Sequence, residues 1–550
     1  MKTILIKRAA PLLVCLTLSL QFSTLSLTAA VLTVTSLADS GPGSLRDEVG
    51  LSAAGDTIQF AVNGTILLSS AINIPHTLNL LGPGPSALIV NANHVDRAFV
   101  TSGSSTTMIS GMTIINGFVV GVPGAAGGVG QSGAAGGDAS GGAIYDGGNS
   151  LTLSNCWLVG NTAQGGPGGF GGENPPGAGF TPGNGGAGGA AAGGAVYCAN
   201  NYPLVVVNCS FSDNRAAGGV GGAGGTNYNP AVTEIGGTGG TGGNAFGGAV
   251  NDAVSPGGPD FTNSTFSAND VSGGQGGAGG DSLNGPGGQG GGGGNGVAGA
   301  ILIFQYANFT SCTIVSNSAF AGTGGGGGNG TPPGPSGMPG SGSGGGVVGY
   351  TIAPTCVNTI GNTILADNFA STVESNYDVY FGDNGYNFIG SLDLLFPCGI
   401  LPTTQVGTVA VPIHPQLGPL AQNGGGLPTH ATSLTSPVTD QGYSFGLTTD
   451  ERGAPRPYVF SSIPKPAGGD GSDIGAFELG SSDLGLDTVS NNLVLSWPAY
   501  YGDFTLQSAT NLQGSNNWTD VPGTPIVVGS QLVVTNPITS ALMFYRLINH

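Results

Sequence analysis

The chain has 550 residues, of which 108 are glycine and 7% are charged, and its formal net charge is −19. This acidity argues against nucleic acid and anionic membrane surfaces as partners, because both repel a negative protein. Hydrophobic residues make up 39% of the chain, which is enough to build a core. We therefore expect the glycine to be concentrated in special segments rather than to signal general disorder.

Residues 1–30 have the features of an export signal. Lys2, Lys7 and Arg8 give a positive start, a long apolar run follows, and small residues lead up to Ala30. A membrane anchor is the alternative, because the apolar run is long. No later segment is apolar enough to span a bilayer. We expect a mature chain that is exported without membrane insertion, to the extracellular space or a cell surface.

Residues 31–60 are predicted to form an N-terminal cap. Two strand-like runs flank a short helix, which begins with a capping-box pattern at Ser44. Leu45, Val49 and Ala53 would share one apolar face of that helix. A stack of strands needs such a cover, because its end exposes unpaired strands and apolar core.

A short pattern returns five times further along the chain. Each unit starts at a small–Gly–Ala or similar triplet centred on residue 142, 194, 248, 299 or 346 and continues in short β-prone runs. Downstream in each unit an apolar residue stands three positions before an asparagine. Internal repeats of this kind indicate stacking, because one unit alone cannot bury its inward face.

Stacking gives two repeated columns a structural role. The first should form a ladder of side-chain amides that bond to the backbone and to one another, and it comprises Asn161, Asn214, Asn269, Asn317 and Asn368. The second should place small residues inside the stack, and it comprises Cys156, Cys209, Ser264, Cys312 and Thr363. Cys156 and Cys209 would be neighbours, either as a disulfide or as reduced, buried thiols.

Glycine-rich insertions fall at the same place in every unit, after the asparagine and before the next triplet. They cover residues 117–140, 164–192, 215–246, 271–297 and 319–344. Because their position is shared, all five are predicted to leave the stack by one edge. Glycine at two of every three positions suits bundles of extended helices with three residues per turn. Flexible loops are the alternative, because glycine loses the most entropy on ordering.

The predicted fold class is all-β. We expect a parallel β solenoid over residues 61–480, with glycine-rich inserted lobes. A short linker follows. Residues 484–550 alternate apolar residues with turn signals, which predicts a separate, small antiparallel β-sandwich domain.

Candidate catalytic residues are sparse. A lyase that cuts acidic polysaccharides needs basic side chains, but residues 98–451 contain only one, Arg215. A glycosidase needs two carboxylates instead. Asp146 and Asp252 occupy matching positions two units apart, with Cys198 between them, and strand spacing would separate them by about 9.6 Å, near the range of inverting enzymes. They are a weak alternative to aspartates that merely face solvent.

The sequence predicts no metal site and no cofactor. Its cysteines lack paired metal-ligand spacing, and its histidines are scattered, with His414 and His430 in the C-terminal part of the predicted solenoid. Residues 276–284 match a calcium-binding nonapeptide once. Calcium sites of that kind need tandem turns that supply carboxylates, so calcium is only a weak possibility.

Several motifs resemble known families. "LTVTSLADSGPGSLRDEV" and "GDTIQF" resemble the N-terminal segment of secreted bacterial right-handed parallel β-helix proteins. "GGAIY" and "GGAVY", with "FSDN" and "FSAN", resemble the polymorphic outer membrane protein repeat. "HPQLGPLAQNGG" and "DIGAFE" resemble the choice-of-anchor Q module that closes such folds. This resemblance, over residue 31 to about 480, implies a right-handed parallel β-helix of the pectin-lyase-like fold, with a closing module at about 360–480. It also implies export, and it implies no defined catalytic residues.

These observations favour an adhesin or a structural scaffold at the cell surface, without catalysis. Its expected partners are polysaccharides or components of cell surfaces and matrix. The alternative is an extracellular polysaccharide-degrading enzyme, a glycosidase rather than a lyase.

Overall fold

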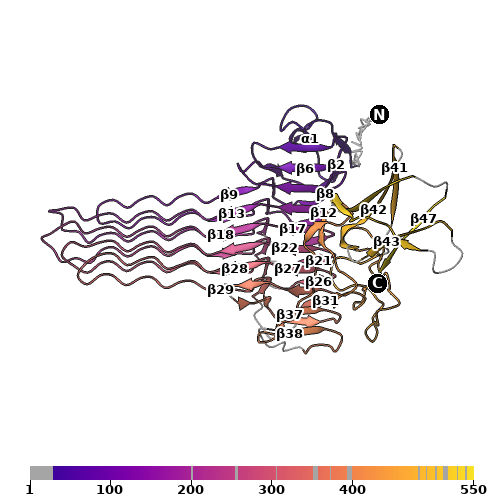
Figure 1. Ribbon diagram of the computed structural model, residues 1–550. Coiled ribbons are helices and arrows are strands. Elements are labelled where there is room, and N and C mark those ends of the chain that lie inside the picture. The colour runs from indigo at the N-terminus through magenta and orange to yellow at the C-terminus, as the bar shows by residue number, and fades with distance from the viewer. Residues whose placement is uncertain are drawn as a thin grey trace, which may run out of the picture.

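A computed structural model gives the arrangement of most of the chain (Figure 1). It describes residues 29–199, 202–253, 258–304, 306–350, 357–371, 373–392, 399–480, 484–490, 492–501, 504–511, 518–528, 531–538 and 542–549. Residues 1–28 of the predicted export signal lie outside these ranges. Within them, none of the helices is both long and apolar enough to cross a membrane.

The described chain is almost entirely β, which confirms the predicted all-β class. Most strands belong to four sheets whose neighbouring strands run parallel, apart from the last pair of one sheet. The largest sheet holds β1 (Val31–Val34), β2 (Asp56–Phe60), β3 (Gly64–Leu67), β5 (Leu78–Leu81), β6 (Leu88–Asn91), β8 (Thr106–Ile115), β12 (Ser150–Val159), β16 (Leu204–Val207), β17 (Ser210–Ser212), β21 (Asp260–Thr262), β22 (Thr265–Ser267), β26 (Asn308–Thr310), β27 (Thr313–Val315), β31 (Asn358–Gly361), β32 (Ile364–Ala366), β36 (Phe381–Asp383), β37 (Phe388–Leu392) and β38 (Gln405–Thr408).

The other three sheets contain fewer strands than the largest sheet, and their strands stack in the same direction (Figure 1). One holds β4 (Ile72–Ile74), β7 (Phe99–Thr101), β11 (Ile144–Asp146), β15 (Val196–Cys198), β20 (Val250–Asp252), β25 (Ile301–Ile303), β30 (Val347–Gly349) and β35 (Tyr377–Asp378). The next holds β9 (Phe118–Val120), β13 (Thr162–Gln164), β18 (Arg215–Ala217), β23 (Asp270–Ser272), β28 (Ser318–Phe320), β33 (Phe369–Ala370) and β34 (Val373–Glu374). The last holds β10 (Ala139–Ser140), β14 (Ala191–Ala192), β19 (Ala245–Phe246), β24 (Gly296–Val297) and β29 (Gly342–Ser343).

Equivalent residues of successive repeats lie directly opposite one another, as the sequence columns predict. The apolar residue that precedes each asparagine shows this register, because the pairs run Leu158–Phe211, Phe211–Phe266, Phe266–Ile314 and Ile314–Leu365. The rings of Phe211 and Phe266 stack with their centroids 4.7 Å apart. One hydrophobic core runs through the whole repeat stack, so each repeat buries its inward face against its neighbours.

The predicted helix at the N-terminal end is present as α1 (Leu45–Leu51). Ser44 is its N-cap, and the Ser44 hydroxyl accepts a hydrogen bond from the Asp47 backbone N–H at 3.2 Å. Leu45 and Val49 are buried in the core of the repeat stack. The helix lies at the end of that stack (Figure 1), where it covers apolar residues that no further strand covers.

After β38, residues 409–480 run back along the largest sheet and are held there by buried polar contacts. The only described strand pair of this return is antiparallel, β39 (Leu420–Gln422) with β40 (Pro428–His430). Arg456 forms a fully buried ion pair with Glu478 at 2.9 Å. The Thr265 hydroxyl donates to Glu451 at 2.5 Å. The ion pair joins two parts of the returning segment. The Thr265 bond, together with the Arg456 guanidinium donating to the Asn263 side-chain oxygen at 3.3 Å, holds this segment against the middle of the stack.

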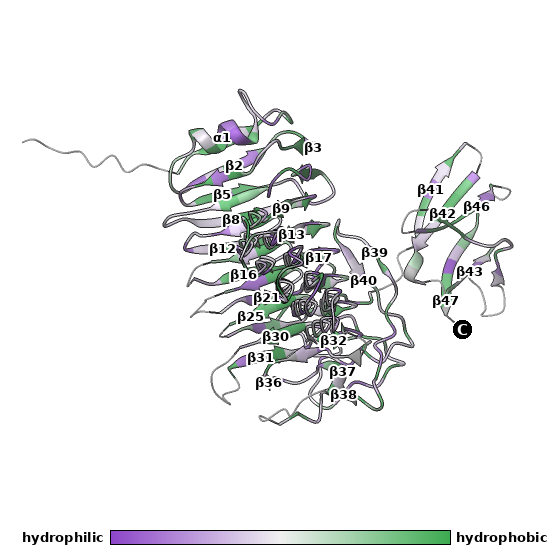
Figure 2. Cartoon of the chain, turned by 90° about the vertical axis from the view of Figure 1, so that its left-hand side faces the viewer, coloured by the Kyte–Doolittle hydropathy of each residue, from purple (hydrophilic) through white to green (hydrophobic). Residues whose placement is uncertain are grey.

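Two antiparallel sheets form the C-terminal part (Figure 2). One has the order β41 (Gly485–Val489), β42 (Asn492–Pro498), β46 (Gln531–Pro537), β45 (Ile526–Val528), and the other has the order β44 (Thr519–Asp520), β43 (Phe504–Ala509), β47 (Phe544–Asn549). The 3-10 helix η1 (Ala499–Tyr501) lies between β42 and β43. Trp497 is fully buried in a cluster that includes Phe477 and Leu479, so these sheets pack on the returning segment.

Candidate functional site

The predicted asparagine column is a continuous ladder inside the repeat stack. All five side chains are fully buried. Each amide nitrogen donates to the side-chain oxygen of the next asparagine, at 2.9 Å for Asn161–Asn214, 2.9 Å for Asn214–Asn269, 2.9 Å for Asn269–Asn317 and 2.8 Å for Asn317–Asn368. The Asn368 amide donates to Asn376 at 3.1 Å, which extends the ladder by one step. The ladder fixes the turn from which every glycine insertion leaves.

The small-residue column lies buried beside it. Cys156, Cys209 and Cys312 are free thiols, so no disulfide links Cys156 to Cys209. The Cys156 backbone N–H donates to the Cys209 sulfur at 3.4 Å, and the Cys209 N–H donates to the Ser264 hydroxyl at 3.1 Å. Burial raises the pKa of Cys312 to about 12. Burial also raises the pKa of Cys209 well above its usual value. These two thiols therefore stay protonated, and the column as a whole supports packing inside the stack.

Asp146 and Asp252 are enclosed by the fold, so they offer no open catalytic pair of the kind that the glycosidase alternative needs. Both stand opposite Cys198, one on each side, as the sequence spacing predicts. However, their side chains are 1% and 0% exposed. Asp146 follows the core residue Ile144 by two positions and therefore shares its inward face. The Thr101 hydroxyl donates to the Asp146 carboxylate. A sugar chain cannot reach carboxylates enclosed in this way.

Asp252 is a buried acid without a polar partner. Within the described chain neither of its carboxylate oxygens has a hydrogen-bond partner. Burial and the charge of Asp146 raise the pKa of Asp252 from 3.8 to about 7. The folded chain therefore favours the protonated acid, and it loses stability as the pH rises from the unfolded pKa towards the folded pKa.

This shift predicts a pH-dependent difference between the wild type and Asp252→Asn. Raising the pH from about 5.5 to about 7.0 should shift the difference in free energy of unfolding by about 2 kcal/mol in favour of the variant. Urea unfolding at both pH values measures it. Asp487→Asn, at an exposed position, is the control and should show no such shift. A pH-independent difference between Asp252→Asn and the wild type would contradict the assignment.

His414 and His430 join the returning segment to the repeat stack. The His430 Nδ1–H donates to the Gly418 carbonyl at 2.8 Å, which leaves Nε2 to accept from the Ser267 hydroxyl at 2.9 Å. Burial lowers the pKa of His430, so its imidazole is neutral at neutral pH. His414 Nδ1 lies 2.6 Å from the Asp367 carboxylate. Both histidines therefore make contacts that close the fold.

The five glycine insertions form one ordered arm that extends from one side of the stack (Figure 1). We call residues 117–140, 164–192, 215–246, 271–297 and 319–344 the glycine arm. Each insertion leaves through a strand of the β9–β28 sheet and returns through a strand of the β10–β29 sheet. The predicted side-by-side bundle is confirmed, and the flexible-loop alternative is wrong.

Backbone hydrogen bonds at every third residue hold the insertions together. Outgoing segments of neighbouring insertions are joined at 2.8 to 2.9 Å, for example Gly168 N–H to Val220 O, Gly221 N–H to Gln275 O and Gly276 N–H to Thr323 O. Within one insertion, Gly240 donates to Gly222 at 2.8 Å, and Gly222 in turn donates to Gly186 of the preceding insertion at 2.8 Å. The three-residue step is that of an extended helix with three residues per turn.

Close backbone approach explains the glycine in the arm. A Cβ atom built on Gly240 would overlap the carbonyl oxygen of Gly186, and one built on Gly222 would overlap that of Gly169. Neighbouring backbones thus occupy the space of a side chain. Only the third position of each turn faces outwards, and residues such as Thr238 and Thr241 stand there.

The last insertion carries prolines where no further insertion follows. Pro332 and Pro335 accept hydrogen bonds from Gly287 and Gly290 through their carbonyl oxygens, at 2.9 Å each. Pro333 and Pro339 lie on the same returning segment. Proline has no N–H group, so this edge of the arm offers fewer donors to another chain.

A second ladder, missed by the sequence analysis, organises the outer end of the arm. The Asn174 amide donates to the Asn227 side-chain oxygen at 2.9 Å, and the Asn227 amide donates to the Ser282 hydroxyl at 3.3 Å. Asn174 and Ser282 are buried, and each forms an isolated parallel bridge with Asn227. Their spacing of 53 and 55 residues matches the repeat period, and this recurrence is the signal that could have identified them.

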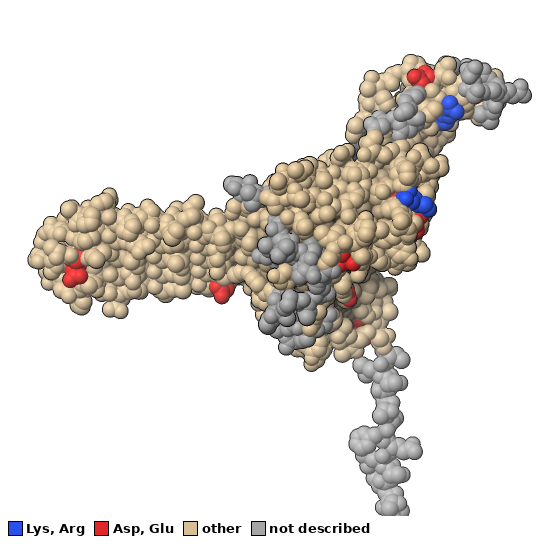
Figure 3. All heavy atoms as spheres, turned by 90° about the horizontal axis from the view of Figure 1, so that it is seen from below, with Lys and Arg blue, Asp and Glu red and all other residues tan. Residues whose placement is uncertain are grey.

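The arm tip, which we define as residues 128–131, 173–182, 226–236 and 281–286, displays apolar and acidic side chains. Phe180, Ile235 and Leu283 are 54%, 56% and 62% exposed, and Val129 and Tyr228 are also exposed. Glu173, Glu234 and Asp281 are the acidic residues of the tip. On the face of the arm shown in Figure 3, red atoms lie at the outer end and no blue atoms are visible.

The single match to a calcium-binding nonapeptide, residues 276–284, reaches into this tip. Its Asp281 carboxylate accepts hydrogen bonds from the Asn329 backbone N–H at 2.6 Å and from the Asn329 amide at 3.1 Å. In the part of the chain that the structure describes, no group of three or more His, Cys, Asp or Glu residues could hold a metal ion. Asp281 therefore acts as a link between two insertions.

The comparisons with known proteins add no relative to this picture. No family model, curated protein or solved structure matches the chain.

Proposed function

We propose that the protein is an exported adhesin or surface scaffold, built as a right-handed parallel β-helix. In this proposal the glycine arm is a rigid support that displays the side chains of the tip to a binding partner. The in-register parallel pairing of successive repeats supports the β-helix. Residues 1–30 and the motifs that resemble secreted β-helix proteins support export and a bacterial cell-surface location.

The observation that carries this proposal is the arm itself. Its backbone is ordered by hydrogen bonds across all five insertions, and its tip displays side chains that the fold does not bury. An exposed apolar group on a rigid support binds a partner with little loss of entropy. Large exposed apolar residues that cluster on one surface mark interaction sites.

The composition of the tip indicates the class of partner. Polysaccharides and matrix components present flat apolar faces beside hydroxyl groups, and aromatic rings such as Phe180 and Tyr228 can pack on them. The tip contains no lysine or arginine. An acidic polysaccharide would therefore be repelled, so a neutral polymer or a basic surface component is the expected partner.

The enzyme alternative receives no support from the geometry. Asp146 and Asp252 are enclosed, and Cys198 stands between them. A glycosidase pair must flank the scissile bond of its substrate. We therefore expect binding without turnover.

Replacing both Phe180 and Tyr228 with alanine should weaken binding of the full chain at least tenfold, because both rings belong to the exposed tip. Pull-down on a panel of neutral and acidic polysaccharides, and on the producing cells, measures this. Phe320→Ala is the control, since Phe320 is exposed at the root of the arm, outside the tip. Equal binding by the double variant and the wild type would exclude the tip as the contact surface.

The same panel tests catalysis. The wild type should release no new reducing ends from any polysaccharide. Release of reducing ends that disappears in Asp146→Asn would overturn the adhesin proposal in favour of a glycosidase.

A further inference from the structure

The four-stranded C-terminal sheet ends in two exposed apolar strands. In the described chain, β41 pairs only with β42, and β45 pairs only with β46. Leu486 of β41 is 63% exposed and Val527 of β45 is 68% exposed. β41 has one charged residue, Asp487, and Pro525 directly precedes β45, but neither strand contains a lysine, an arginine or a proline. Soluble proteins normally protect their edge strands with such residues, because open edges pair with other chains.

The free backbone groups on each edge follow from the hairpin geometry. The β41–β42 pairing closes at Val489 and Asn492, with two residues between them. Such a closing pair is hydrogen bonded, and alternate pairs are not. The N–H and C=O groups of Leu486 and Thr488 therefore point away from β42. By the same count from Val528 and Gln531, those of Val527 point away from β46.

The two edges are complementary in direction. Every neighbouring pair in the order β41-β42-β46-β45 is antiparallel, so β41 and β45 run in opposite directions. A second copy in the same orientation can lay its β45 antiparallel along β41. The sheet then continues across the contact without a change of pattern.

The side chains on the facing edges also match. Cross-strand partners share a face of a sheet. Leu486 stands opposite Leu495, Leu495 stands opposite Val534, and Leu532, two residues before Val534, stands opposite Val527. Leu486 and Val527 therefore face the same side of the sheet, towards the second C-terminal sheet.

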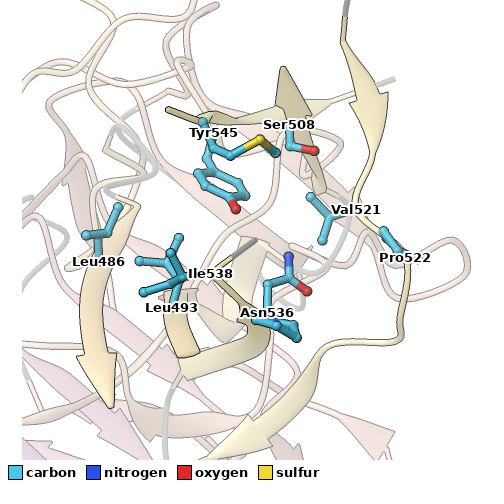
Figure 4. A pocket seen from close by; sticks show the side chains of 10 residues that line it. Leu486, Leu493, Ser508, Val521, Pro522, Asn536, Ile538 and Tyr545 are labelled. Atoms are coloured by element: carbon cyan, nitrogen blue, oxygen red, sulfur yellow. The ribbon is translucent and has the colours of Figure 1, made fainter. Parts of the chain in front are cut away.

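A pocket of about 400 Å³ opens on this side, between the two sheets. Leu486 lines one wall, Leu493 and Ile538 lie beside it, and the ring of Tyr545 points into the pocket from the opposite sheet (Figure 4). An apolar side chain brought along β41 by a second copy would lie next to this pocket. Covering it would remove exposed apolar surface from water.

We infer that β41 of one copy pairs with β45 of a second copy, so that the four-stranded sheet continues from molecule to molecule. The contact is heterologous, with different surfaces on its two sides, and translation does not close it into a ring. It therefore builds open chains of molecules. Because each edge is short, the contact is weak in solution and becomes effective where the protein is concentrated. This inference is independent of the arm and its proposed partner.

Two proline variants of the full chain test it. Thr488→Pro removes an outward N–H from β41, and Val527→Pro removes one from β45, while the hydrogen bonds within the sheet stay intact. Both side chains are exposed, so each variant should keep a Tm within a few degrees of the wild type. Thr488→Ala and Val527→Ala, which keep the N–H groups, are the matched controls.

Analytical ultracentrifugation at about 0.1 mM separates the outcomes. The wild type and the alanine controls should form a concentration-dependent series of species. Each proline variant alone should be monomeric, and an equimolar mixture of the two should form a dimer, because one supplies a free β45 and the other a free β41. A monomeric wild type, a mixture that stays monomeric, self-association of either proline variant, or monomeric alanine controls would overturn the proposal.

Discussion

A valine in place of Gly240 is expected to break up the middle of the glycine arm. The first carbon of its side chain would overlap the Gly186 carbonyl oxygen. The Gly240 N–H also donates to Gly222, and its carbonyl accepts from Gly277, at 2.8 Å each. Overpacking and the loss of these bonds should together destabilise the arm by roughly 3 kcal/mol or more.

Hydrogen exchange of the arm amides measures this effect. In the wild type the hydrogen-bonded glycine N–H groups should be protected, and in Gly240→Val those around residues 222, 240 and 277 should exchange rapidly. Thr241→Val is the control, since it places the same valine one position further on, at an exposed site. Wild-type protection in Gly240→Val would show that the arm tolerates side chains inside the bundle.

Asn214→Ala should lower the free energy of unfolding by about 4 kcal/mol. The Asn214 side-chain oxygen accepts from the backbone N–H of Asn161 at 3.2 Å and from its amide at 2.9 Å. The Asn214 amide donates to the Leu158 carbonyl and to Asn269, at 2.9 Å each. Alanine leaves several of these buried partners unpaired, and each costs on the order of 1 kcal/mol or more.

Urea unfolding of the full chain measures this loss. Asn244→Ala is the matched control, because the Asn244 side chain is exposed and accepts a single hydrogen bond, from the Asn295 N–H at 2.8 Å. We expect it to cost less than 1 kcal/mol. Similar losses in the two variants would contradict the role of the buried ladder.

The stacking of the fold could be predicted from the sequence because every repeat carries the same residues at the same offsets. Asn161 and Asn214 recur in equivalent positions, and a parallel stack is the arrangement that brings such residues together. The glycine arm was predictable in part for the same reason, since glycine at two of three positions suits closely packed extended backbones, but this composition also fits flexible loops.

Other features depend on contacts between residues that do not belong to the repeated columns, so the repeat pattern does not predict them. Asp146 looked like a surface aspartate, although its place two residues after Ile144 assigns it to the inward face. The pairing of Arg456 with Glu478, and the packing of Trp497 on Phe477, join segments that share no pattern. The side chains of the tip, such as Phe180, lie in turns whose lengths differ between insertions. Local periodicity therefore does not predict their positions or their exposure.

The three-residue phase of the glycine arm restricts how its length can change during evolution. One added residue would rotate every later position by a third of a turn and point a side chain at a neighbouring backbone. Insertions and deletions are therefore tolerable only as whole triplets, matched on the outgoing and returning segments. The length of such an arm can therefore change only in steps of about 9 Å, the rise of one three-residue turn.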